Sequence, residues 1–265
     1  MLRIGKKHLT ALAAALSLAG AAHARGFEEI DASRYLSICA APQELPFSAQ
    51  DGPARGIYID IAGRIAAALG LELRVDWIRS REQIRFTSCD AVMGSALLKD
   101  EAAPEPDPAK LHRKLLTLPY MKARAVIVAD PKIGAIASLR DLRPHHVAVP
   151  SASLAHKMLN DNAVPVWVRF RTDREIIEAV QRGDAEAGVV TNLAIGWHRK
   201  QHGADGLNVF PDVLDQSELG FRVGISLRNT NLATLERVNA VLAKLIADGA
   251  IDAILAEYGA QGAAH

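Results

Sequence analysis

The sequence predicts an α/β protein of two lobes, each with a parallel sheet, joined by two long hinge strands. Strands alternate with helices between residues 35 and 95, and the same order begins again between residues 138 and 190. Such alternation is typical of parallel sheets covered by helices. A further apolar stretch at 219–227 leads to helical patterns at 232–247 and 250–258, so we expect the chain to return to the first lobe.

The first unit is organised around the stretch from Tyr35 to Ser48. It begins as a short apolar run that is able to form a buried strand. Pro42 and Pro46 stop that strand, because proline lacks the backbone donor that a sheet requires. The chain after the strand is therefore an irregular loop, and it carries Phe47 and Ser48. Ligands of open parallel sheets bind outside the carboxyl ends of the strands, so we expect this loop to border a binding site.

An amphipathic helix is predicted for residues 56–70, where large aliphatic residues recur at steps of four and Gly70 supplies the end. The first unit continues with a strand at 71–78, a short polar helix at 80–86 and a strand at 89–95. The segment 99–110 follows. Its three prolines and four acidic residues predict an exposed loop.

The second unit begins after an apolar stretch at 115–120 and a strand at 125–129. Its predicted parts are a capped turn at 138–141, strands at 147–149, 164–170 and 187–190, and a helix that starts at Thr172, runs through Val180 and is stopped by Gly183. The turn and this helix both start with the spacing of a capping box, which in the helix is formed by Thr172 and Glu175. Ser151 or Ser153 caps one further helix after the strand at 147–149.

The N-terminus has the pattern of a secretory signal peptide, for which we take residues 1–24. A basic start precedes an apolar run at 9–22, and a small-x-small cleavage pattern ends at Ala24. The run is shorter than the ~20 residues that a membrane-spanning helix needs. We therefore expect cleavage before Arg25, a location in the periplasm and no membrane insertion of the mature chain.

The composition argues against a nucleic-acid partner, but it does not decide whether the two cysteines form a disulfide. The chain has 31 basic and 30 acidic residues, so it lacks the excess of positive charge expected of a nucleic-acid-binding protein. Its two cysteines, Cys39 and Cys89, would lie in an oxidising compartment. The sequence leaves their pairing open, because parallel neighbouring strands can hold the two Cα atoms beyond the ~7 Å that a disulfide bridges.

The order of elements and a set of short motifs resemble the periplasmic solute-binding proteins of family 3, which have the type II fold. The motifs span nearly all of the chain after the signal peptide. They are Cys39-Ala-Ala-Pro42 with Leu45-Pro-Phe-Ser48, Cys89-Asp-Ala-Val-Met-Gly94, Arg113 with Thr117-x-Pro-Tyr120, Ala179-Val-x-x-Gly183 with Ala194-x-Gly196, and Ile251-Asp-Ala-Ile-Leu-Ala-Glu-Tyr-Gly259. Within the family, the chain is similar to the binding-protein-like subunits associated with quinoprotein methanol dehydrogenases.

The resemblance implies a two-lobed type II periplasmic binding protein fold with two hinge strands. Residues 25–122 and 223–265 would form lobe I, and residues 123–222 would form lobe II. The lobes of such proteins close on a ligand about their hinge.

The resemblance also shows where the chain departs from the family. Members that bind amino acids hold the ligand's carboxylate with an arginine and its ammonium group with an acid. In this chain Arg113 lies closer to Tyr120 than the usual arginine does. Ala41 and Thr191 stand where acids are expected. A zwitterion would lose its charge partners there, and unpaired buried charges are costly, which argues against capture of an amino acid.

The favoured function is therefore that of a non-catalytic accessory protein of a quinoprotein alcohol or methanol dehydrogenase. By resemblance its partner would be a pyrroloquinoline-quinone-dependent dehydrogenase or that enzyme's cytochrome c, and the chain itself would carry no cofactor and no metal. Two alternatives stay open. One is the substrate-binding protein of an ABC transporter, which delivers an amino acid or another small polar solute to a permease. The other is a dehydratase-like enzyme on the same fold, with Glu44 as the candidate acid.

Ten residues, several of them at strand ends that face the expected cleft, are the candidates for ligand binding. They are Phe47, Ser48, Gly94, Ser95, Arg113, Tyr120, Ser151, Ser153, Thr191 and Asn192. His198 and His202 have a helical spacing that can bind zinc, but basic neighbours repel a cation, so we interpret both as surface histidines. The chain has no nucleophile elbow and no glycine-rich phosphate loop, and we expect no enzymatic activity.

Overall fold

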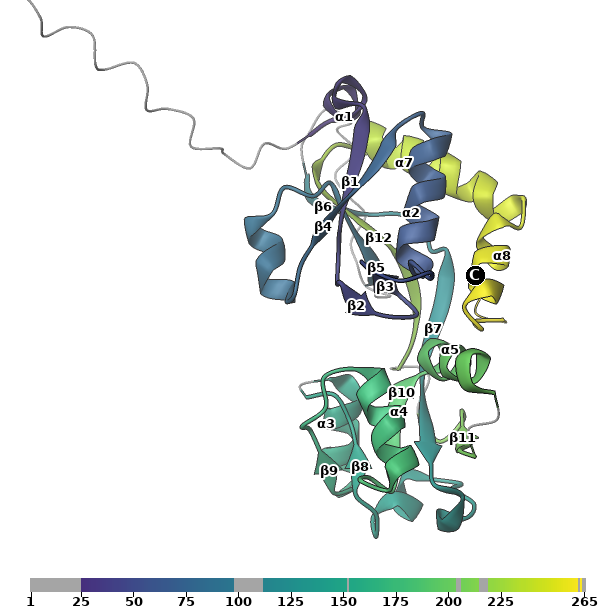
Figure 1. The fold of residues 1–265 in the computed structure, drawn as a ribbon. Coiled ribbons are helices and arrows are strands. Elements are labelled where there is room, and N and C mark those ends of the chain that lie inside the picture. Colours follow the sequence, from purple (N-terminus) through teal and green to yellow (C-terminus); the bar gives the residue numbers. More distant parts are fainter. Residues whose placement is uncertain are drawn as a thin grey trace, which may run out of the picture.

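The computed structural model has two lobes that are joined by long strands (Figure 1). It describes residues 25–97, 112–151, 153–203, 206–214, 219–261 and 263. The predicted signal peptide and the predicted loop at 99–110 lie outside the described residues. Within the described ranges, every helix is too short or too polar to span a bilayer.

Lobe I contains the first αβ unit and the C-terminal helices. Its elements are α1 (Phe27–Ser33), β1 (Tyr35–Ala40), β2 (Gln43–Glu44), β3 (Ser48–Ala49), α2 (Ile57–Ala68), β4 (Glu72–Trp77), η1 (Arg81–Phe86), β5 (Ala91–Leu97), β6 (His112–Leu116), α7 (Leu232–Ala247) and α8 (Ala250–Glu257). β1 pairs in parallel with both β4 and β5. The alternation in the sequence thus builds the predicted parallel sheet, and α2, α7 and α8 pack together beside it (Figure 1).

Lobe II contains the second unit. Its elements are η2 (Pro131–Ile133), η3 (Leu139–Leu142), β8 (Val147–Ala148), α3 (Leu154–Asp161), β9 (Val166–Trp167), α4 (Asp173–Arg182), β10 (Ala187–Thr191), α5 (Asn192–His202) and β11 (Asn208–Phe210). β8 pairs in parallel with both β9 and β10. The three strands of this unit therefore run in one direction, as predicted.

Two strands cross between the lobes, β7 (Met121–Ala129) and β12 (Gly220–Thr230). β7 pairs antiparallel with β12 through residues 121–124 and with β10 of lobe II through residues 125–129. β12 pairs in turn with β5 and β6 of lobe I. One sheet therefore continues through both lobes, and the two predicted hinge strands are confirmed (Figure 1). The predicted lobe boundaries fall inside this hinge ladder.

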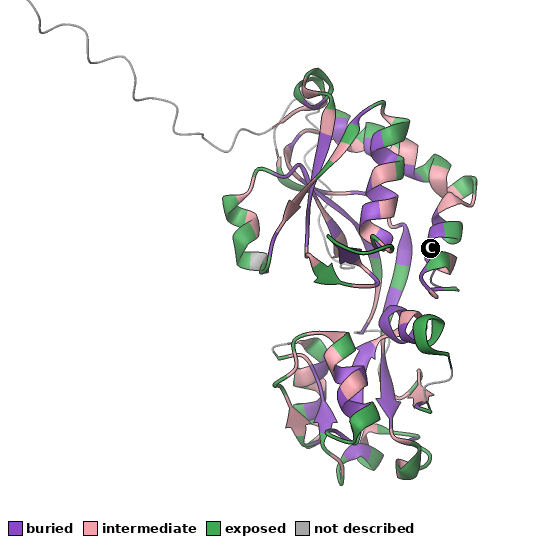
Figure 2. Cartoon of the chain, in the orientation of Figure 1, coloured by how far each residue is buried: buried purple, intermediate pink, exposed green. Residues whose placement is uncertain are grey.

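Each lobe has its own hydrophobic core (Figure 2). In lobe I, α2 buries Ile57, Ile61 and Ile65, the predicted stripe at steps of four. Burial of each such side chain contributes about 1.5–3 kcal/mol. In lobe II, the neighbouring β7 residues Ile127 and Val128 belong to two different clusters of buried hydrophobic side chains. Because successive strand residues point to opposite faces, lobe II has a core on each face of its sheet.

Helix α5 holds the two lobes together beside the hinge. Gly196 of α5 and Gly259 after α8 approach so closely that a Cβ on either residue would overlap the carbonyl group of the other. One residue farther along α5, Trp197 packs on Tyr258 of lobe I with ring centroids 5.3 Å apart. Only glycine fits at this backbone crossing. The first turns of α5 are therefore fixed against lobe I, although β10 before it belongs to lobe II.

Several elements differ from their sequence predictions. The predicted strand at 164–170 is reduced to β9, because β9 pairs only with the two-residue strand β8. The polar helix at 80–86 is a 3₁₀ helix. Helix α1 was not predicted, because its N-cap, Gly26, has no side chain that could cap the helix and indicate its start.

The predicted helix caps are confirmed in most respects. Ser138 and Asp141 form the predicted capping box. In α4, the Thr172 hydroxyl accepts the Glu175 amide as expected, but the Glu175 carboxylate accepts the Arg171 amide at 2.7 Å instead of the Thr172 amide. The bond from the Glu175 carboxylate back to the backbone is therefore made to the residue before the N-cap and not to the N-cap itself.

The interpretation of both α5 histidines as surface residues is wrong for His198. This side chain is buried, and its Nε2 lies 3.0 Å from the side-chain nitrogen of Gln181. Its ring stacks on His202 with centroids 4.5 Å apart. His198 is buried because α4 packs over it through Gln181. The spacing of residues within α5 alone could not predict this contact with another helix.

Candidate functional site

The strands of lobe I and lobe II end toward each other. β5 and β7 both run antiparallel to β12, so β5 ends on the side of lobe II. β10 runs antiparallel to β7, and its last residue, Thr191, pairs with Ala125 in the hinge ladder. The carboxyl edges of the two sheets therefore face each other beside the hinge (Figure 1). Ligands of parallel sheets bind at such edges.

In lobe I, hydrogen bonds within the loop after β1 and to Tyr258 hold that loop in place. The buried Ser48 donates its hydroxyl to the carbonyl of Ala41 at 2.7 Å. At the end of the loop, the Gly56 amide donates to the Tyr258 hydroxyl at 2.8 Å, and Tyr258 donates to Asp60 at 2.6 Å. Burial, together with the bond to Asp60, raises the pKa of Tyr258 to about 12, so the phenol keeps its proton. The hydroxyl of Ser48 thus shapes the loop.

Phe47, Gly94 and Tyr120 come together around Tyr58. The Phe47 and Tyr58 rings stack with centroids 5.2 Å apart. Gly94 has φ 72°, and a Cβ there would overlap the Tyr58 hydroxyl. The Gly94 amide donates to the hydroxyl of Tyr120 at 3.3 Å. Tyr120 is wholly buried, and burial raises its pKa well above the ordinary value. It therefore supports the middle of β5 from within the core.

The other two lobe I candidates lie apart from each other. Ser95 is close to the hinge, where it pairs with Gly224 near the start of β12. The residues on either side of Arg113 pair with Arg228 and Thr230 at the other end of β12. Because β12 enters lobe I from the hinge at its first residues, Arg113 lies toward the far edge of the lobe. The structure does not bring Arg113 to the other candidates.

In lobe II, α4 and α5 and the start of α3 follow the ends of parallel strands, so their first turns lie at the facing edge. Ser153 is the N-cap of α3, since its hydroxyl accepts the His156 amide at 3.0 Å and donates to the Pro150 carbonyl at 2.8 Å. Ser151 is exposed in the preceding turn. Free amides at helix starts favour polar or negative groups.

Thr191 meets a residue that was not a candidate, Asp173, at the first turn of α4, whereas Asn192 bonds to the hinge. The Thr191 amide and hydroxyl donate to the same carboxylate oxygen of Asp173, at 2.8 and 2.7 Å. The Thr191 hydroxyl also accepts the Ala194 amide and so caps α5. Asn192 accepts the Arg124 amide at 3.0 Å, which ties the start of α5 to the hinge. Burial raises the pKa of the Asp173 carboxyl.

Tyr58 and Asp173 were missing from the sequence-based candidates. Asp173 lies between Thr172 and Glu175, the two residues interpreted as a capping box, and no separate role was assigned to it. The first turn of α4 has two acids, and a capping box needs only one of them, Glu175, so the sequence did indicate that Asp173 could have another role. Tyr58 carries no such signal, because its contact with Gly94 joins α2 to a strand far along the chain.

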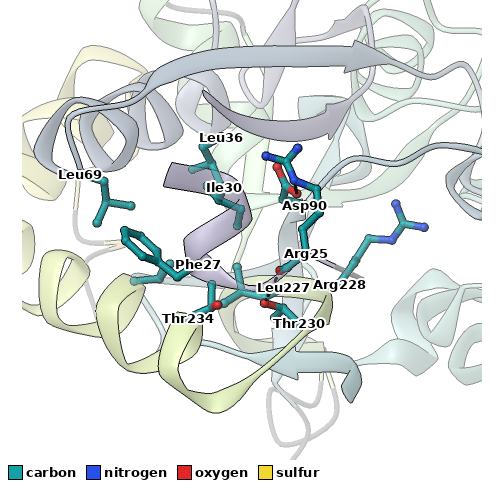
Figure 3. A pocket seen from close by; sticks show the side chains of 11 residues that line it. Arg25, Phe27, Ile30, Leu36, Leu69, Asp90, Leu227, Arg228, Thr230 and Thr234 are labelled. Carbon is teal, nitrogen blue, oxygen red and sulfur yellow. Dashed lines mark hydrogen bonds and ion pairs between the residues drawn. The ribbon is translucent and has the colours of Figure 1, made fainter. Parts of the chain in front are cut away.

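Lobe I also has a cavity, whose lining side chains Figure 3 shows. Its walls include the aliphatic Leu36 and Leu227 together with Phe27. Leu36 lies near the start of β1, and Asp90 directly precedes β5, so the cavity is at the amino edge of the sheet. Its carboxylate, Asp90, is already paired with Arg25, the atoms being 3.5 Å apart. We therefore do not place the ligand site there.

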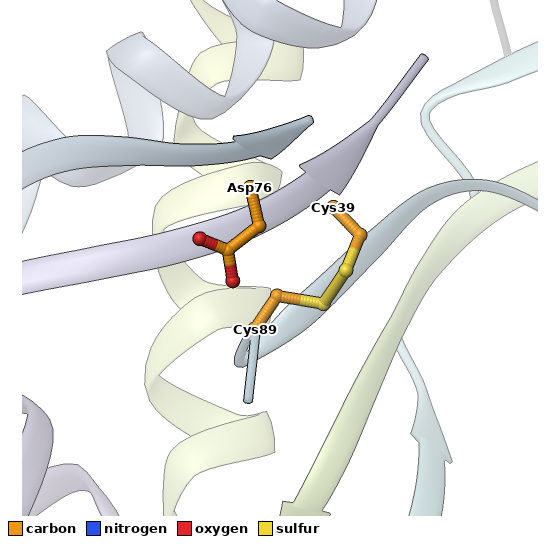
Figure 4. A group of neighbouring side chains, drawn as sticks. All are labelled: Cys39, Asp76 and Cys89. Carbon is orange, nitrogen blue, oxygen red and sulfur yellow. A yellow bond between two sulfur atoms is a disulfide. The ribbon is translucent and has the colours of Figure 1, made fainter. Parts of the chain in front are cut away.

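Cys39 and Cys89 form a disulfide, with their Cα atoms 5.6 Å apart (Figure 4). The bond is within reach because the chain before β5 is held over β1, where Arg228 donates to the carbonyls of Ile84 and Cys89. Asp76 lies beside the two sulfur atoms. Since both thiols are used in the disulfide, these three residues offer a metal only one carboxylate.

Comparisons with known proteins identify relatives of the whole two-lobed unit. The model of the bacterial extracellular solute-binding proteins, family 3, matches residues 36–261. A probable amino-acid ABC transporter-binding protein of Haemophilus influenzae is 24% identical over 237 residues, which are 87% of this chain and 87% of the relative.

Solved structures of low sequence identity share the fold. An ABC uptake transporter substrate-binding protein from Streptococcus pneumoniae with bound histidine has a TM-score of 0.69 at 14% identity, covering 90% of this chain and 97% of that one. The ancestral amino-acid-binding protein AncCDT-1, a precursor of cyclohexadienyl dehydratase, has a TM-score of 0.68 at 21% identity, covering 87% and 98%. The predicted two-lobed type II periplasmic binding protein fold is confirmed.

Proposed function

Because the chain belongs to family 3 of the bacterial extracellular solute-binding proteins, we propose that it is the solute receptor of an ABC transporter. The observation that carries this proposal is the pair of carboxyl edges that face each other beside the ladder of β7 and β12. A solute bound between two hinged lobes favours their closed arrangement, and the permease recognises that arrangement. The relative from Haemophilus influenzae, which matches over 87% of both chains, supports the same role.

The solute is small and polar. Lobe II offers the starts of three helices, whose first amides and capping hydroxyls suit polar groups. Lobe I offers the stacked rings of Phe47 and Tyr58, which suit an apolar part of the solute. The facing edges thus combine a few polar groups with apolar surface, as small-molecule sites do.

The transporter role takes the place of the function favoured from sequence. The descriptions of the relatives reported above name amino-acid binding and transport, and none of them names a dehydrogenase. Association with a quinoprotein dehydrogenase or its cytochrome c rests on short motifs and stays a prediction. Affinity capture with the mature chain as bait separates the two roles, because a receptor retains a permease and an accessory protein retains a dehydrogenase.

A dehydratase-like activity is the remaining alternative. AncCDT-1 gives it some support through the fold that it shares with this chain. The candidate acid Glu44 is exposed on β2, and the family is one of binding proteins. We therefore propose a role without catalysis for this chain.

Membership of the family supports a location of the protein outside the cytoplasm. Family 3 proteins are extracellular solute-binding proteins, and no described helix can span a bilayer. Removal of residues 1–24 and release into the periplasm stay predictions. N-terminal sequencing of the exported protein tests them, since cleavage at the proposed site leaves Arg25 as the first residue.

Thermal unfolding with a panel of small polar solutes tests the receptor function. A solute at 100 times its dissociation constant adds about 2.7 kcal/mol of stability. For a chain of this size we expect the melting temperature to rise by about 5–10 °C. Small-angle X-ray scattering should show a smaller radius of gyration with the same solute. If no solute of a broad panel changes either quantity, the receptor function is wrong.

A further inference from the structure

Lobe II places an enclosed carboxylate at the edge that faces lobe I. Asp173 is the first residue of α4, and one of its oxygens, Oδ2, accepts both the amide and the hydroxyl of Thr191. Thr191 ends β10 and pairs with Ala125 of the hinge ladder. The carboxylate is therefore held in a fixed orientation next to the hinge, at the carboxyl edge of the lobe II sheet.

Asp173 has no positively charged partner among the described residues. Burial and the two bonds from Thr191 account for the shift in its pKa, without a contribution from any charged group. The adjacent Arg174 pairs with Glu178 at 3.0 Å. Ionised side chains in packed surroundings are normally paired, because an uncompensated charge there is costly. A carboxylate without a counter-ion at a binding edge is a candidate for recognition of a ligand.

The second carboxylate oxygen of Asp173 is not fully enclosed. It has no hydrogen-bond partner in the described part of the chain, where the only buried polar side-chain atom without a partner is Nε2 of His112. Oδ1 of Asp173 thus accepts no hydrogen bond from the described residues and keeps some exposure to solvent. Thr191 fixes one oxygen of the carboxylate and leaves the other free to accept from a ligand.

Helix capping does not explain this acid. The first turn of α4 is capped by Thr172, whose hydroxyl accepts the Glu175 amide, and by Glu175, whose carboxylate accepts the Arg171 amide. Asp173 instead bonds to Thr191 of β10, outside its own helix. An acid at a helix start gains some stability from the helix dipole, but this gain does not require a carboxylate that points to another strand.

We propose that Asp173 is the residue that binds the cationic group of the solute, a protonated amine or a guanidinium group. The inference rests on the proposed receptor function and names the class of solute. Thr191 stands where an acid was expected from the family resemblance, and here its amide and hydroxyl orient an acid that comes from α4. The negative charge is thus still present at the edge, although it comes from another element.

Isothermal titration of the full mature chain tests the inference. The probes are L-arginine, L-lysine and agmatine as cations, with succinate and D-glucose as solutes without a cationic group. We expect the wild type to bind at least one cationic probe and Asp173→Asn to bind it at least about 30-fold more weakly, as for a charge pair that is shielded from water. The asparagine keeps an oxygen for the two bonds from Thr191, and a thermal melt verifies that the variant is folded.

Asp90→Asn is the matched control, because Asp90 has the same pair of bonds but lies at the amino edge of lobe I. Its affinity for the cationic probe should stay within about threefold of the wild type. Equal affinity of Asp173→Asn and the wild type overturns the inference. Binding of succinate or glucose alone also overturns it, but leaves the receptor function standing. Binding of none of the five probes overturns the inference, and the broader thermal panel then decides the receptor function separately.

Discussion

Each lobe contains one enclosed aspartate that accepts two hydrogen bonds from a single residue of a neighbouring strand. In lobe I, one oxygen of Asp90 accepts the amide and the hydroxyl of Ser37 at 2.9 and 2.7 Å. In lobe II, one oxygen of Asp173 accepts the amide and the hydroxyl of Thr191 at 2.8 and 2.7 Å. Burial is the largest cause that raises the pKa of both carboxyls.

The two acids differ in what neutralises them. Arg25 lies 3.5 Å from the second oxygen of Asp90 (Figure 3). The pair is at the edge of lobe I away from lobe II. Asp173 lies at the facing edge and has no such partner among the described residues. Among the described residues, Asp90 thus has a positively charged partner within lobe I, whereas Asp173, which lies at the edge of the proposed solute site, has none. Uncompensated groups of this kind concentrate at functional sites.

Lobe I has a second internal constraint that lobe II lacks, because the only two cysteines of the chain form its disulfide. The bond closes a loop with a sequence separation of 50 residues. Replacing Cys39 and Cys89 with alanine should lower the free energy of unfolding by about 4 kcal/mol, mainly through the entropy of the unfolded chain. Urea unfolding measures the loss, and hydrogen exchange assigns it to a lobe. An equal loss of protection in lobe II amides would contradict the independence of the two cores.

Asp90→Asn should have the next largest effect on stability. The substitution leaves the Arg25 guanidinium, which is mostly buried, without its carboxylate, at a cost of about 2 kcal/mol. Urea unfolding of the variant measures this loss. The double variant Asp90→Asn with Arg25→Leu should lose less than the sum of the two single variants, because the two side chains are coupled. Additive losses would mean that the ion pair contributes nothing.

The order of elements could be predicted from the sequence because it depends on local patterns. The steps of four in α2 and the prolines after β1 fixed those elements to within a residue or two. Helix α1 and strand β9 depend on pairing and packing with distant segments, and their predictions failed or were too long. The hinge was predictable because apolar stretches at 125–129 and 219–227 stand on either side of the second unit, and the second of them leads back to helices of the first lobe.

Site residues could be predicted only where their position directly after a predicted strand is enough to place them at the facing edge. Thr191 and Asn192 follow a predicted strand, and the structure places both at the facing edge. Arg113 was judged by its spacing from Tyr120, whereas its place is decided by the antiparallel pairing of β6 with the far end of β12. Asp173 was hidden for the opposite reason, because a local explanation was at hand. Local patterns therefore identify helix starts, but not the contacts that those starts make.

The smallest expected effect gives the sharpest test of the contrast between the two acids. Asp173→Asn should raise the free energy of unfolding at neutral pH, by about 1 kcal/mol, since it removes an uncompensated charge at a functional edge. In the unfolded chain an aspartate ionises near pH 3.9, and burial raises the pKa of Asp173 in the folded chain.

Between these two pKa values the folded wild type binds more protons than the unfolded chain, so its stability falls as pH rises through that range and then levels off. The asparagine variant lacks this contribution, and its advantage should therefore open above about pH 4 and persist at neutral pH. Urea unfolding of both proteins across this range measures it. If Asp173→Asn instead loses stability as Asp90→Asn does, Asp173 is a structural acid like its counterpart. A saturating cationic solute should reverse the order at neutral pH, because only the wild type gains the charge pair.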